Sequence, residues 1–310
     1  MKVSVVVPIY NGEADLPALI KCLEAQTYPK NLTEFILVNN NSSDRTATLL
    51  ETAIKNSDIN LKIQQENNIQ SSYAARNQGI RAAQNNIIAF TDADCRPMPD
   101  WLAQLMRPFS NAQIGIVAGE IVALPGKTLL EKYAEFTNIM SQKHLLDHPF
   151  CPYGQTANLA IRRQALAEVG LFRPYLTTGG DADICWRILQ QTKWQLEFAP
   201  PAIIRHRHRD NLKDFKSQWR RYGCSNRYLH ELYGVDLMRE LTAKETFYRL
   251  SRWLLKEIPK AIAQKNPIIA LIKTPIDLIA FQARTKGQKE AKLPQEAHQI
   301  EWLENRLSPR

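Results

Sequence analysis

The sequence predicts an α/β protein built around a mostly parallel sheet. Along the first ninety residues, short apolar β-branched segments alternate with segments whose apolar residues recur at helical spacing. Strands that alternate with helices of about 10–15 residues are typical of crossover units, and such units build parallel sheets. The chain has 310 residues, of which 44% are hydrophobic, so it allows one large domain with a smaller appendage and is not disordered.

Four strands and three helices are predicted in order along this first stretch. The strands are the β-branched runs Val3–Ile9, Phe35–Val38, Leu61–Gln65 and Ile87–Phe90. The first helix begins after Asp15, which can act as its N-cap. Apolar residues three and four positions apart support the helices: Leu16, Leu19, Ile20 and Leu23, then Leu49, Leu50, Ala53 and Ile54, and finally an alanine-rich segment around 71–84.

Residues 114–204 have more strand character. Strands are predicted at Ile114–Leu124, Ala157–Ile161 and Gln195–Phe198, with helices around 163–169 and 181–191. From Leu212 onward the apolar and aromatic residues keep helical spacing, so we place a domain boundary near residue 210. The last twenty residues are polar, and we expect them to be mobile.

The net charge is +9, from 40 Lys and Arg against 31 Asp and Glu, and the excess is uneven. Residues 205–228 hold eight Lys or Arg against only Asp210 and Asp214. Such a patch attracts phosphate, as a nucleotide diphosphate or an anionic lipid surface, or is simply a solvated helix face. Nucleic-acid binding is not expected, because the basic residues are not interleaved with stacking aromatics on a recognised module.

Cysteine usage and hydropathy indicate a cytoplasmic protein. The five cysteines are scattered and form no CxxC pair, which argues against a disulfide framework or a structural zinc site. The apolar N-terminal stretch is too short for a signal peptide, and no uncharged apolar run reaches the roughly 18 residues of a membrane span. The longest apolar tract, Pro267–Phe281, contains Lys273 and Asp277. This tract either lies in a membrane interface or packs on the first domain or on a second subunit.

Three polar clusters directly follow predicted strands: Tyr10-Asn11, Asn39–Asp44 and Asp92-Ala93-Asp94. Ligands of parallel sheets bind at the carboxyl ends of the strands, so the three clusters should face one crevice. The carboxylates of Asp92 and Asp94 can share a divalent cation or divide between metal and ribose hydroxyls. The alternative is a loop with two solvated acids.

Four further residues could carry chemistry. Asp181, near the start of a predicted helix, could accept a proton from a substrate hydroxyl or simply cap the helix. Arg76 has the planar donor fork that suits a diphosphate, but an ordinary exposed helix charge is an equal alternative. His206 and His208 lie two apart on an extended segment, where alternate side chains point to opposite sides, so at most one could join a shared metal site.

Taken in order, these clusters resemble the family 2 inverting glycosyltransferases over roughly residues 2–210. Six segments in register carry the resemblance: Val5–Gly12, Val38–Thr46, Ala75–Ile80, Phe90–Asp94, Tyr153–Asn158 with Arg162-Arg163, and Val169–Phe172 with Gly180–Arg187. The resemblance implies the GT-A fold, with a mostly parallel central sheet and flanking helices. It implies a catalytic domain over 1–210, with a Rossmann-like nucleotide half (about 1–124) and an acceptor half (about 125–210), followed by a helical extension over 211–310.

The resemblance also implies a role for each matching residue. Asp181 would be the catalytic base, and Arg76 would approach the diphosphate of the donor. Asp92 would contact ribose or metal, and Asp94 would bind the metal directly. His206 would complete the metal site, with His208 as the alternative. The pocket for the nucleotide base would be lined by Pro8, Tyr10, Asn11 and Asn39.

The implied activity is metal-dependent, inverting transfer of a hexosyl or related sugar from a nucleotide-sugar, with UDP as the expected nucleotide. The acceptor would be a hydroxyl of a growing glycan or lipid-linked saccharide, the cation Mn²⁺ or Mg²⁺, and the protein peripheral at the cytoplasmic (inner) face of a membrane. Two departures leave details open. The family usually has Asp where Asn39 stands, and it often has Glu-Asp where this chain has Gly180-Asp181.

Other functions stay as alternatives. A nucleotidyltransferase fits poorly, because the loop Tyr10–Ala14 lacks the glycine-rich, lysine-bearing character such enzymes need. A sugar-nucleotide hydrolase or a degenerate nucleotide-sugar-binding module remains possible, although a degenerate site need not keep Asp92, Asp94 and Asp181 together. The segment Gln218–Tyr222 is similar to the QxxRW element of processive polysaccharide synthases. It is interpreted as a helix over the active site that supplies Trp219 and Arg221, or as plain amphipathic packing.

Overall fold

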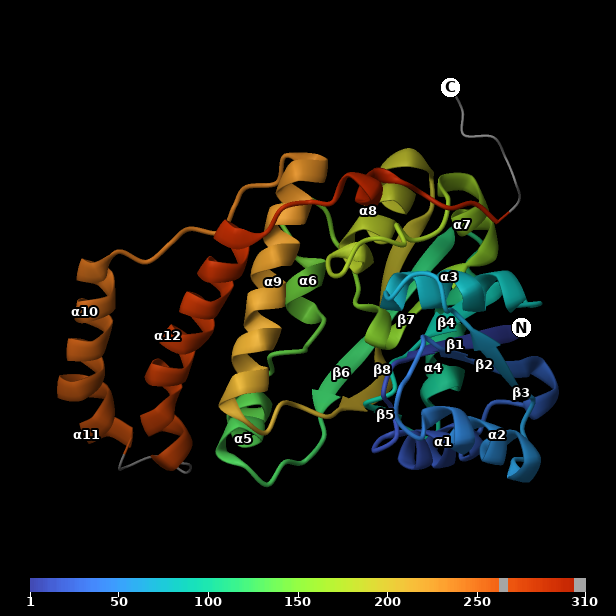
Figure 1. The fold of residues 1–310 in the computed structure, drawn as a ribbon, viewed down its shortest axis with the longest axis horizontal. Helices are drawn as coiled ribbons and strands as arrows, with labels where there is room; N and C mark the ends of the chain where they lie inside the picture. The colour runs from blue at the N-terminus through green and yellow to red at the C-terminus, as the bar shows by residue number, and fades with distance from the viewer. Residues whose placement is uncertain (262–266, 304–310) are drawn as a thin grey trace. The chain divides into compact units, whose positions relative to one another are not determined.

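The computed structural model describes residues 1–261 and 267–303, which form two compact units (Figure 1). The first unit contains Met1–Val122, Met140–His206 and the described residues from Pro294 onward. The second contains Ala123–Ile139 and Arg207–Leu293. The predicted boundary near residue 210 lies close to the observed one after His206. The predicted division differs in two segments, because residues 123–139 belong to the second unit and the tail from Pro294 belongs to the first.

The first unit alternates strands and helices. Its strands are β1 (Val3–Ile9), β2 (Thr33–Asn39), β3 (Leu61–Gln65), β4 (Ile87–Phe90), β5 (Cys95–Pro97), β6 (Ile114–Ala123), β7 (Leu159–Arg162) and β8 (Gln195–His206). Its helices are α1 (Leu16–Glu24), α2 (Thr46–Asn56), α3 (Ser72–Ala82), α4 (Trp101–Met106), α6 (Lys143–Leu146), α7 (Arg163–Val169) and α8 (Gly180–Gln191). The short elements β5, α4 and α6 are additions to the predicted set.

All eight strands form one sheet in the order β3-β2-β1-β4-β7-β6-β8-β5. Strands β3, β2, β1 and β4 pair in parallel, with Val3 opposite both Thr33 and Ile87. The pairs β4–β7, β6–β7 and β5–β8 are antiparallel. The parallel pairing therefore covers the first ninety residues, as the alternating pattern predicts. The valines of β1 are fully buried, which is typical of a parallel strand covered on both faces.

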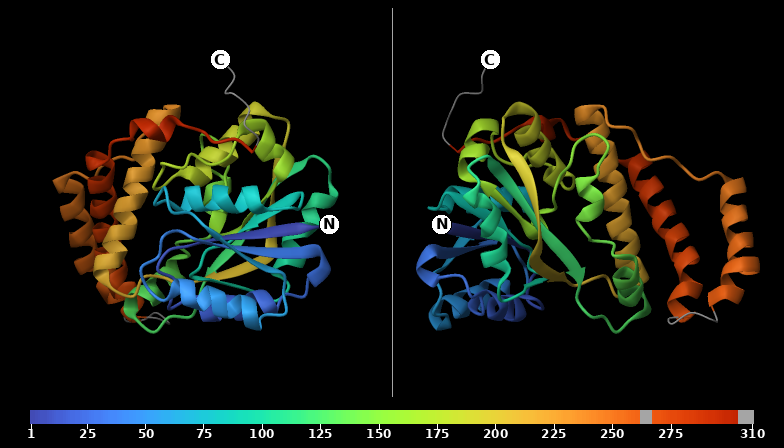
Figure 2. Two further views of the ribbon diagram at one scale, coloured as in Figure 1. Left: turned by 45° about the vertical axis from the view of Figure 1, so that its right-hand side comes forward. Right: turned by 180° about the vertical axis from the view of Figure 1, so that it is seen from behind.

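Helices cover both faces of the parallel strands. Figure 2 shows α3 on one face and α1 and α2 on the other. This arrangement follows from the strand order, because right-handed crossovers from β1 to β2 and from β2 to β3 run in one direction, whereas the return from β3 to β4 runs in the opposite one. Gly79 lets α3 lie close on the sheet, since a Cβ there would be 2.3 Å from Cγ1 of Val6.

The second unit is helical. It contains α5 (Leu129–Thr137), α9 (Leu212–Tyr233), α10 (Ala243–Arg252), a π-helical turn (Trp253–Glu257), α11 (Ile258–Ala261) and α12 (Pro267–Glu290). Helices α9 and α12 pack side by side (Figure 1). Two glycines allow their close approach, because a Cβ at Gly223 would lie 1.9 Å from the carbonyl oxygen of Arg284, and one at Gly287 would lie 2.0 Å from that of Arg220.

The apolar tract Pro267–Phe281 belongs to α12 and contributes to the core of the second unit. Tyr133, Phe215 and Ala280 are buried there, and the partly buried Ile272, Ile276 and Ile279 pack against them. The tract thus contacts α5 and α9 of its own unit. None of the described helices is long and apolar enough to cross a membrane.

The described part of the C-terminal tail packs on the first unit. Ala297 is fully buried, and the amide of Leu171 donates to the carbonyl of Glu301 at 2.7 Å. The Glu301 carboxylate accepts hydrogen bonds from Asn77 at 2.8 Å and from Arg81 at 2.7 Å. The expectation of a mobile tail is therefore wrong for residues 294–303. Its continuation over 304–310 lies outside the described residues.

Candidate active site

The loops after β1 and β2 are tied together at the carboxyl ends of these neighbouring strands. The Asn11 amide donates to the Ser42 hydroxyl at 2.9 Å, and the Ser43 amide donates to the Asn11 side-chain oxygen at 2.9 Å. Asn11 and Asn41 both have positive φ, 48° and 57°, which asparagine tolerates better than other side chains. The two asparagines therefore let both loops turn sharply and line one edge of the crevice.

The four residues predicted for a nucleotide-base pocket lie at this edge. Pro8 and Asn39 are at the last two positions of the paired strands β1 and β2, where Pro8 faces Val38 and Ile9 faces Asn39. Asn39 is buried, and its side-chain oxygen accepts the Ser42 amide at 3.1 Å. Tyr10 is 57% exposed, so its ring is available to a ligand. Asn39 thus holds the loop and presents an uncharged amide where the family usually has a carboxylate.

Helix α3 carries Arg76 into the site. Ser71 caps the helix by accepting the Tyr73 amide at 3.2 Å. Arg76 is almost fully buried, and its Nη2 lies 2.6 Å from Oδ1 of Asp92. Within the described residues, the buried Nε of Arg76 has no hydrogen-bond partner. A buried donor left without an acceptor is costly, so this atom suits an anionic ligand that would occupy the crevice.

The loop that contains Asp92 and Asp94 is fixed between β4 and β5. Strand β5 pairs with the end of β8 so that Cys95 lies opposite His206. This register brings His206 Nε2 to 3.5 Å from Oδ1 of Asp94. Arg96 holds the loop by donating to the carbonyls of Ala93 and Cys95 at 3.0 and 2.8 Å. The antiparallel β5–β8 pair is what unites two of the predicted metal ligands.

The described residues contain no cluster of three or more His, Cys, Asp or Glu side chains that could hold a metal ion. Asp92 is paired with Arg76 instead of joining Asp94 and His206. Mg²⁺ is usually held by one or two carboxylates together with substrate phosphates, so a complete protein cage is not required. The Asp94–His206 pair, with Asp92 beside it in the loop, therefore fits a cation that arrives with a diphosphate.

Asp181 lies in the first turn of α8, where the backbone amides and the helix dipole favour a carboxylate. Its Oδ1 accepts a hydrogen bond from the Thr156 hydroxyl at 2.7 Å. Burial raises the pKa of Asp181 above the usual value, while the nearby charge of Arg76 and the Thr156 hydrogen bond oppose that rise. Asp92 also raises this pKa, so Asp181, Arg76 and Asp92 interact in one region of the first unit.

The structure explains why glycine precedes Asp181. A Cβ at Gly180 would lie 2.7 Å from the ring of Tyr73, so that ring occupies the space of a side chain at this position. Tyr73 also stacks on Phe172 at 5.6 Å, and the Arg76 guanidinium lies 5.5 Å from its ring centroid. Burial and the charge of Asp181 raise the pKa of Tyr73, which stays protonated. Sequence reasoning missed Tyr73, although it lies three residues before Arg76 and hence on the same helix face.

A buried ion-pair network holds α8 in place. Asp183 is fully buried and pairs with Arg173 at 2.8 Å and with Arg187 at 2.9 Å. Arg187 also donates to the carbonyls of Val169 and Leu171, both at 2.6 Å. The network fixes the helix whose first turn carries Asp181, so Asp183 has a structural role that differs from that of the neighbouring carboxylate.

An aromatic cluster lies beside α8 in the predicted acceptor half. The buried ring of Trp186 contacts His148, Phe150 and Tyr153, with ring centroids 5.3, 4.7 and 5.8 Å away. The Trp186 indole also donates to the Cys151 carbonyl at 2.8 Å. The cluster fixes the loop that leads to Thr156, and Phe150 is exposed at its edge. No periodic signal in the sequence identifies these loop residues in advance.

Three residues considered from the sequence lie in the second unit. His208 is two residues beyond the end of β8, whereas His206 lies in the first unit beside Asp94. Trp219 and Arg221 are on α9. Trp219 packs against Phe215 in the core of the second unit, with ring centroids 6.1 Å apart. The geometry of the first unit therefore favours His206 over His208 as a metal ligand, and the role of α9 over the site stays a prediction.

Sequence comparisons agree with this site. The model of glycosyl transferase family 2 matches residues 4–170. The chain is 33% identical over 223 residues to glycosyltransferase AglE of Haloferax volcanii, covering 70% of this chain and 71% of that protein. It is 31% identical over 157 residues to the pre-mycofactocin glycosyltransferase of Mycobacterium tuberculosis, covering 49% of this chain and 33% of that protein.

Solved structures share the fold. A mannosyltransferase from Pyrobaculum calidifontis, in complex with GDP-Man and Mn²⁺, has a TM-score of 0.60 at 17% identity and covers 93% of this chain and 83% of its own. Residues 1–349 of TarS from S. aureus, in complex with UDP, have a TM-score of 0.54 at 16% identity, with 93% and 90% covered. Both neighbours support the α/β fold with C-terminal helices. The chain belongs to glycosyl transferase family 2 and is a glycosyltransferase with the GT-A fold.

Proposed function

We propose that this glycosyltransferase moves a sugar, with inversion at the anomeric carbon, from a nucleotide-sugar to a hydroxyl of a glycan or lipid-linked acceptor. The observation that supports this most directly is the grouping of Asp181, Arg76 and Asp92. The electrostatic influence of Arg76 and Asp92 on the pKa of Asp181 indicates a base and a diphosphate-binding group within one crevice. A base on one side and a cationic group on the other are what a single displacement requires.

In the proposed reaction, Asp181 accepts the proton of the acceptor hydroxyl while that oxygen attacks the anomeric carbon. A glycosidic bond forms, the bond to the diphosphate oxygen breaks, and the nucleoside diphosphate leaves. Thr156 orients the Asp181 carboxylate through its hydrogen bond. Arg76, with its unpartnered Nε, donates to the departing diphosphate and stabilises the charge that develops there.

Asp94 and His206 would hold a divalent cation, Mn²⁺ or Mg²⁺, with Asp92 serving the cation or the donor ribose. Such a cation supplies neutralisation of charge on the leaving diphosphate. The 3.5 Å approach of His206 to Asp94 and the β5–β8 pairing that creates it support this assignment. The presence of Mn²⁺ with GDP-Man in the Pyrobaculum neighbour makes Mn²⁺ the first cation to test.

We propose UDP as the donor nucleotide, bound between Tyr10 and the loop that Asn11 and Asn39 support. One structural neighbour has UDP bound and another has GDP-Man, so the fold accommodates both bases. The uncharged amide of Asn39 makes the base the less certain part of the donor, and a panel of nucleotides tests it directly.

We also propose that the protein works in the cytoplasm, peripheral at the inner face of a membrane. Each of the five cysteines lies in the described part of the chain as a free thiol, as a reducing compartment favours. The net positive charge supports attraction to an anionic lipid surface.

The test is a transfer assay with a panel of nucleotide-sugars and acceptors, run alongside nucleotide-dependent thermal stabilisation with and without Mn²⁺. We expect one nucleotide to raise the unfolding temperature in a Mn²⁺-dependent way, because a ligand that binds only the folded state must do so. We expect its sugar to appear on an acceptor with inverted configuration. Release of free sugar at the same rate without acceptor would identify a hydrolase, and binding without turnover a degenerate module. Either result would overturn the proposal.

A further inference from the structure

The positive charge of this protein is concentrated in the second unit. That unit contains 21 Lys and Arg against 11 Asp and Glu, a net charge of +10. The rest of the chain contains 19 Lys and Arg against 20 Asp and Glu, a net charge of −1. The unit that carries the proposed catalytic residues is thus near neutrality, and the helical unit alone is suited to an anionic partner.

Within the second unit, α10 is an amphipathic helix without a buried residue. Its start is specified by the sequence itself, because Thr242 and Glu245 form a capping box. Large apolar side chains project from α10 and the following π-helical turn, with Phe247 74% exposed, Leu255 73% exposed, and Leu250 and Leu254 also exposed. A surface helix normally buries its apolar stripe, so this stripe lacks the cover that its pattern predicts.

Basic residues surround this stripe. Lys244, Arg249, Arg252 and Lys256 alternate with the apolar residues along the segment 244–256, against the single acid Glu245. An amphipathic helix with aromatic and leucine residues on one side and Lys and Arg on the other is typical of helices that lie in a lipid interface.

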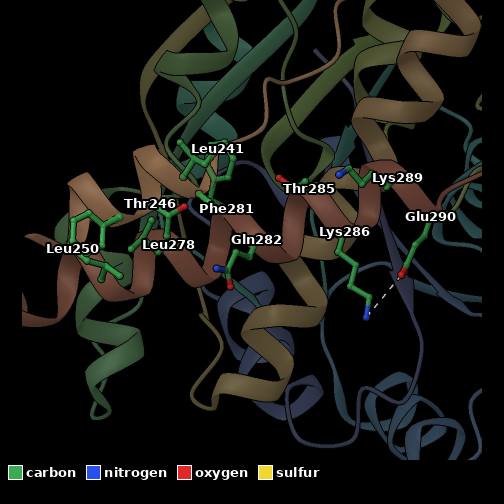
Figure 3. A pocket seen from close by; sticks show the side chains of 12 residues that line it. Leu241, Thr246, Leu250, Leu278, Phe281, Gln282, Thr285, Lys286, Lys289 and Glu290 are labelled. Atoms are coloured by element: carbon green, nitrogen blue, oxygen red, sulfur yellow. Dashed lines mark ion pairs between the residues drawn. The ribbon is translucent and has the colours of Figure 1, made fainter.

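A groove beside the stripe has the same graded character (Figure 3). It lies between α10 and α12 and has a volume of about 770 Å³. Figure 3 shows Leu250 and Leu278 toward one end and Lys286, Lys289 and Glu290 toward the other. The lysines pair with Glu290 at 3.8 Å and with Glu240 at 2.6 Å, but they are more than half exposed and such pairs exchange easily. The groove thus continues from an apolar wall to a cationic rim.

We propose that α10, the turn that follows it and the adjoining groove dock this protein on the surface of an anionic lipid bilayer. The apolar side chains Phe247, Leu250, Leu254 and Leu255 enter the interface, and the flanking Lys and Arg contact the lipid phosphates. The inference rests on the proposed function, because a transferase with a lipid-linked acceptor must meet a bilayer. Charge favours this occupant over a second copy of the chain, since two surfaces of net positive charge repel each other.

The test uses the full-length protein in flotation assays with vesicles of phosphatidylcholine that contain about one third phosphatidylglycerol. We expect binding to these vesicles and at least about tenfold weaker binding to pure phosphatidylcholine, or at high salt, because both conditions remove the electrostatic attraction. The double variant Phe247→Ser with Leu255→Ser keeps the net charge and should weaken vesicle binding by about tenfold or more. Both side chains are largely exposed, so the variant should unfold at the same temperature as the natural protein.

Ile54→Ser provides the matched control, because Ile54 is an exposed apolar residue on α2 of the first unit. It should bind vesicles like the natural protein. Absence of binding to the anionic vesicles, or undiminished binding of the double variant, would overturn the inference. A dimer in solution that the double variant dissociates, without vesicle binding, would assign the surface to a second copy and also overturn it.

Transfer to a soluble acceptor is measured separately. Intact transfer without vesicle binding would overturn only this inference, and vesicle binding without transfer would overturn only the proposed function.

Discussion

The guanidinium of Arg76 lies 2.6 Å from the carboxylate of Asp92, joining helix α3 to the loop after β4. Arg76 is almost fully buried, so its positive charge is compensated by Asp92 before any ligand binds. The Nε atom still lacks a partner within the described residues. One edge of the guanidinium is therefore used to hold the loop, and another is left to donate to an anion.

Replacing Arg76 should weaken donor binding. We expect Arg76→Met to weaken the affinity for the nucleoside diphosphate by roughly ten- to hundredfold, because a hydrogen bond to a charged group contributes about 1.5–3 kcal/mol. Isothermal titration calorimetry with the nucleotide identified above measures this loss. Arg81→Met is the matched control, since Arg81 lies on the same helix and pairs with Glu301. Equal affinities of the natural protein and Arg76→Met would contradict the assignment.

The two histidines at the end of β8 should differ in their effect on the cation. We expect His206→Ala to raise the Mn²⁺ concentration needed for nucleotide-dependent stabilisation by about tenfold or more. His208→Ala should leave that requirement unchanged, because only His206 lies next to Asp94. A Mn²⁺ titration of the unfolding temperature at fixed nucleotide distinguishes them, and both variants are compared at equal folded fraction. The opposite order of effects would assign the site to His208.

The sequence predicts the buried parallel strands and the main helices well, because β1, β2 and β4 are apolar runs with clear ends. It does not predict β5, since three residues around Pro97 carry no periodic signal. It also ends the last strand at Phe198, although β8 continues to His206 through Pro200 and Pro201. Prolines are tolerated there because β5 pairs only with Ile204–His206, leaving that side of β8 open at the prolines.

The candidate site is predictable where chemistry follows a strand directly. Asp92, Asp94 and Asn11 are found this way, since the carboxyl ends of parallel strands share one crevice. Tyr73 and the aromatic loop around Phe150 are not, because their roles depend on contacts between segments far apart in the chain. The same reason hides the packing of the tail, where polar Glu301 reaches Asn77 and Arg81.

Thr156 should set the acid limit of activity. Its hydroxyl donates to Asp181 at 2.7 Å and lowers the pKa of that carboxyl against the effect of burial. Thr156→Val removes the hydrogen bond, so the pKa of Asp181 should rise further. A base must be ionised to act, and the acid limb of the kcat/KM profile should therefore move to higher pH. Thr137→Val, which removes a hydroxyl bonded to the Tyr133 carbonyl, should leave the profile unchanged.

Asp183 should matter for stability more than for chemistry. We expect Asp183→Asn to lower the free energy of unfolding by about 3–5 kcal/mol, because it leaves the buried Arg173 and Arg187 without their counter-charge. Chemical denaturation measures the change. Asp58→Asn is the control, since Asp58 is 73% exposed in its pair with Lys30, and exposed pairs contribute about 0–1 kcal/mol. Equal losses in the two variants would show that burial of the network does not decide its contribution.

Asp181→Asn should reduce transfer and stabilise the fold at the same time. Loss of a general base typically lowers kcat by about 10²- to 10⁴-fold. The pKa of Asp181 is raised in the folded protein, so the folded state holds the proton more tightly than the unfolded state does. The stability that this residue contributes is therefore present below its usual pKa and is lost as the pH rises through the raised folded value.

At neutral pH, Asp181→Asn removes that unfavourable ionisation, and the variant should unfold at the same or a higher temperature than the natural protein. The difference should shrink as the pH falls toward the usual aspartate range, where both side chains are neutral. Calorimetry across pH measures it. A variant that transfers sugar at the natural rate would rule out Asp181 as the base, and one that unfolds at a clearly lower temperature at neutral pH would show that the carboxylate stabilises the fold.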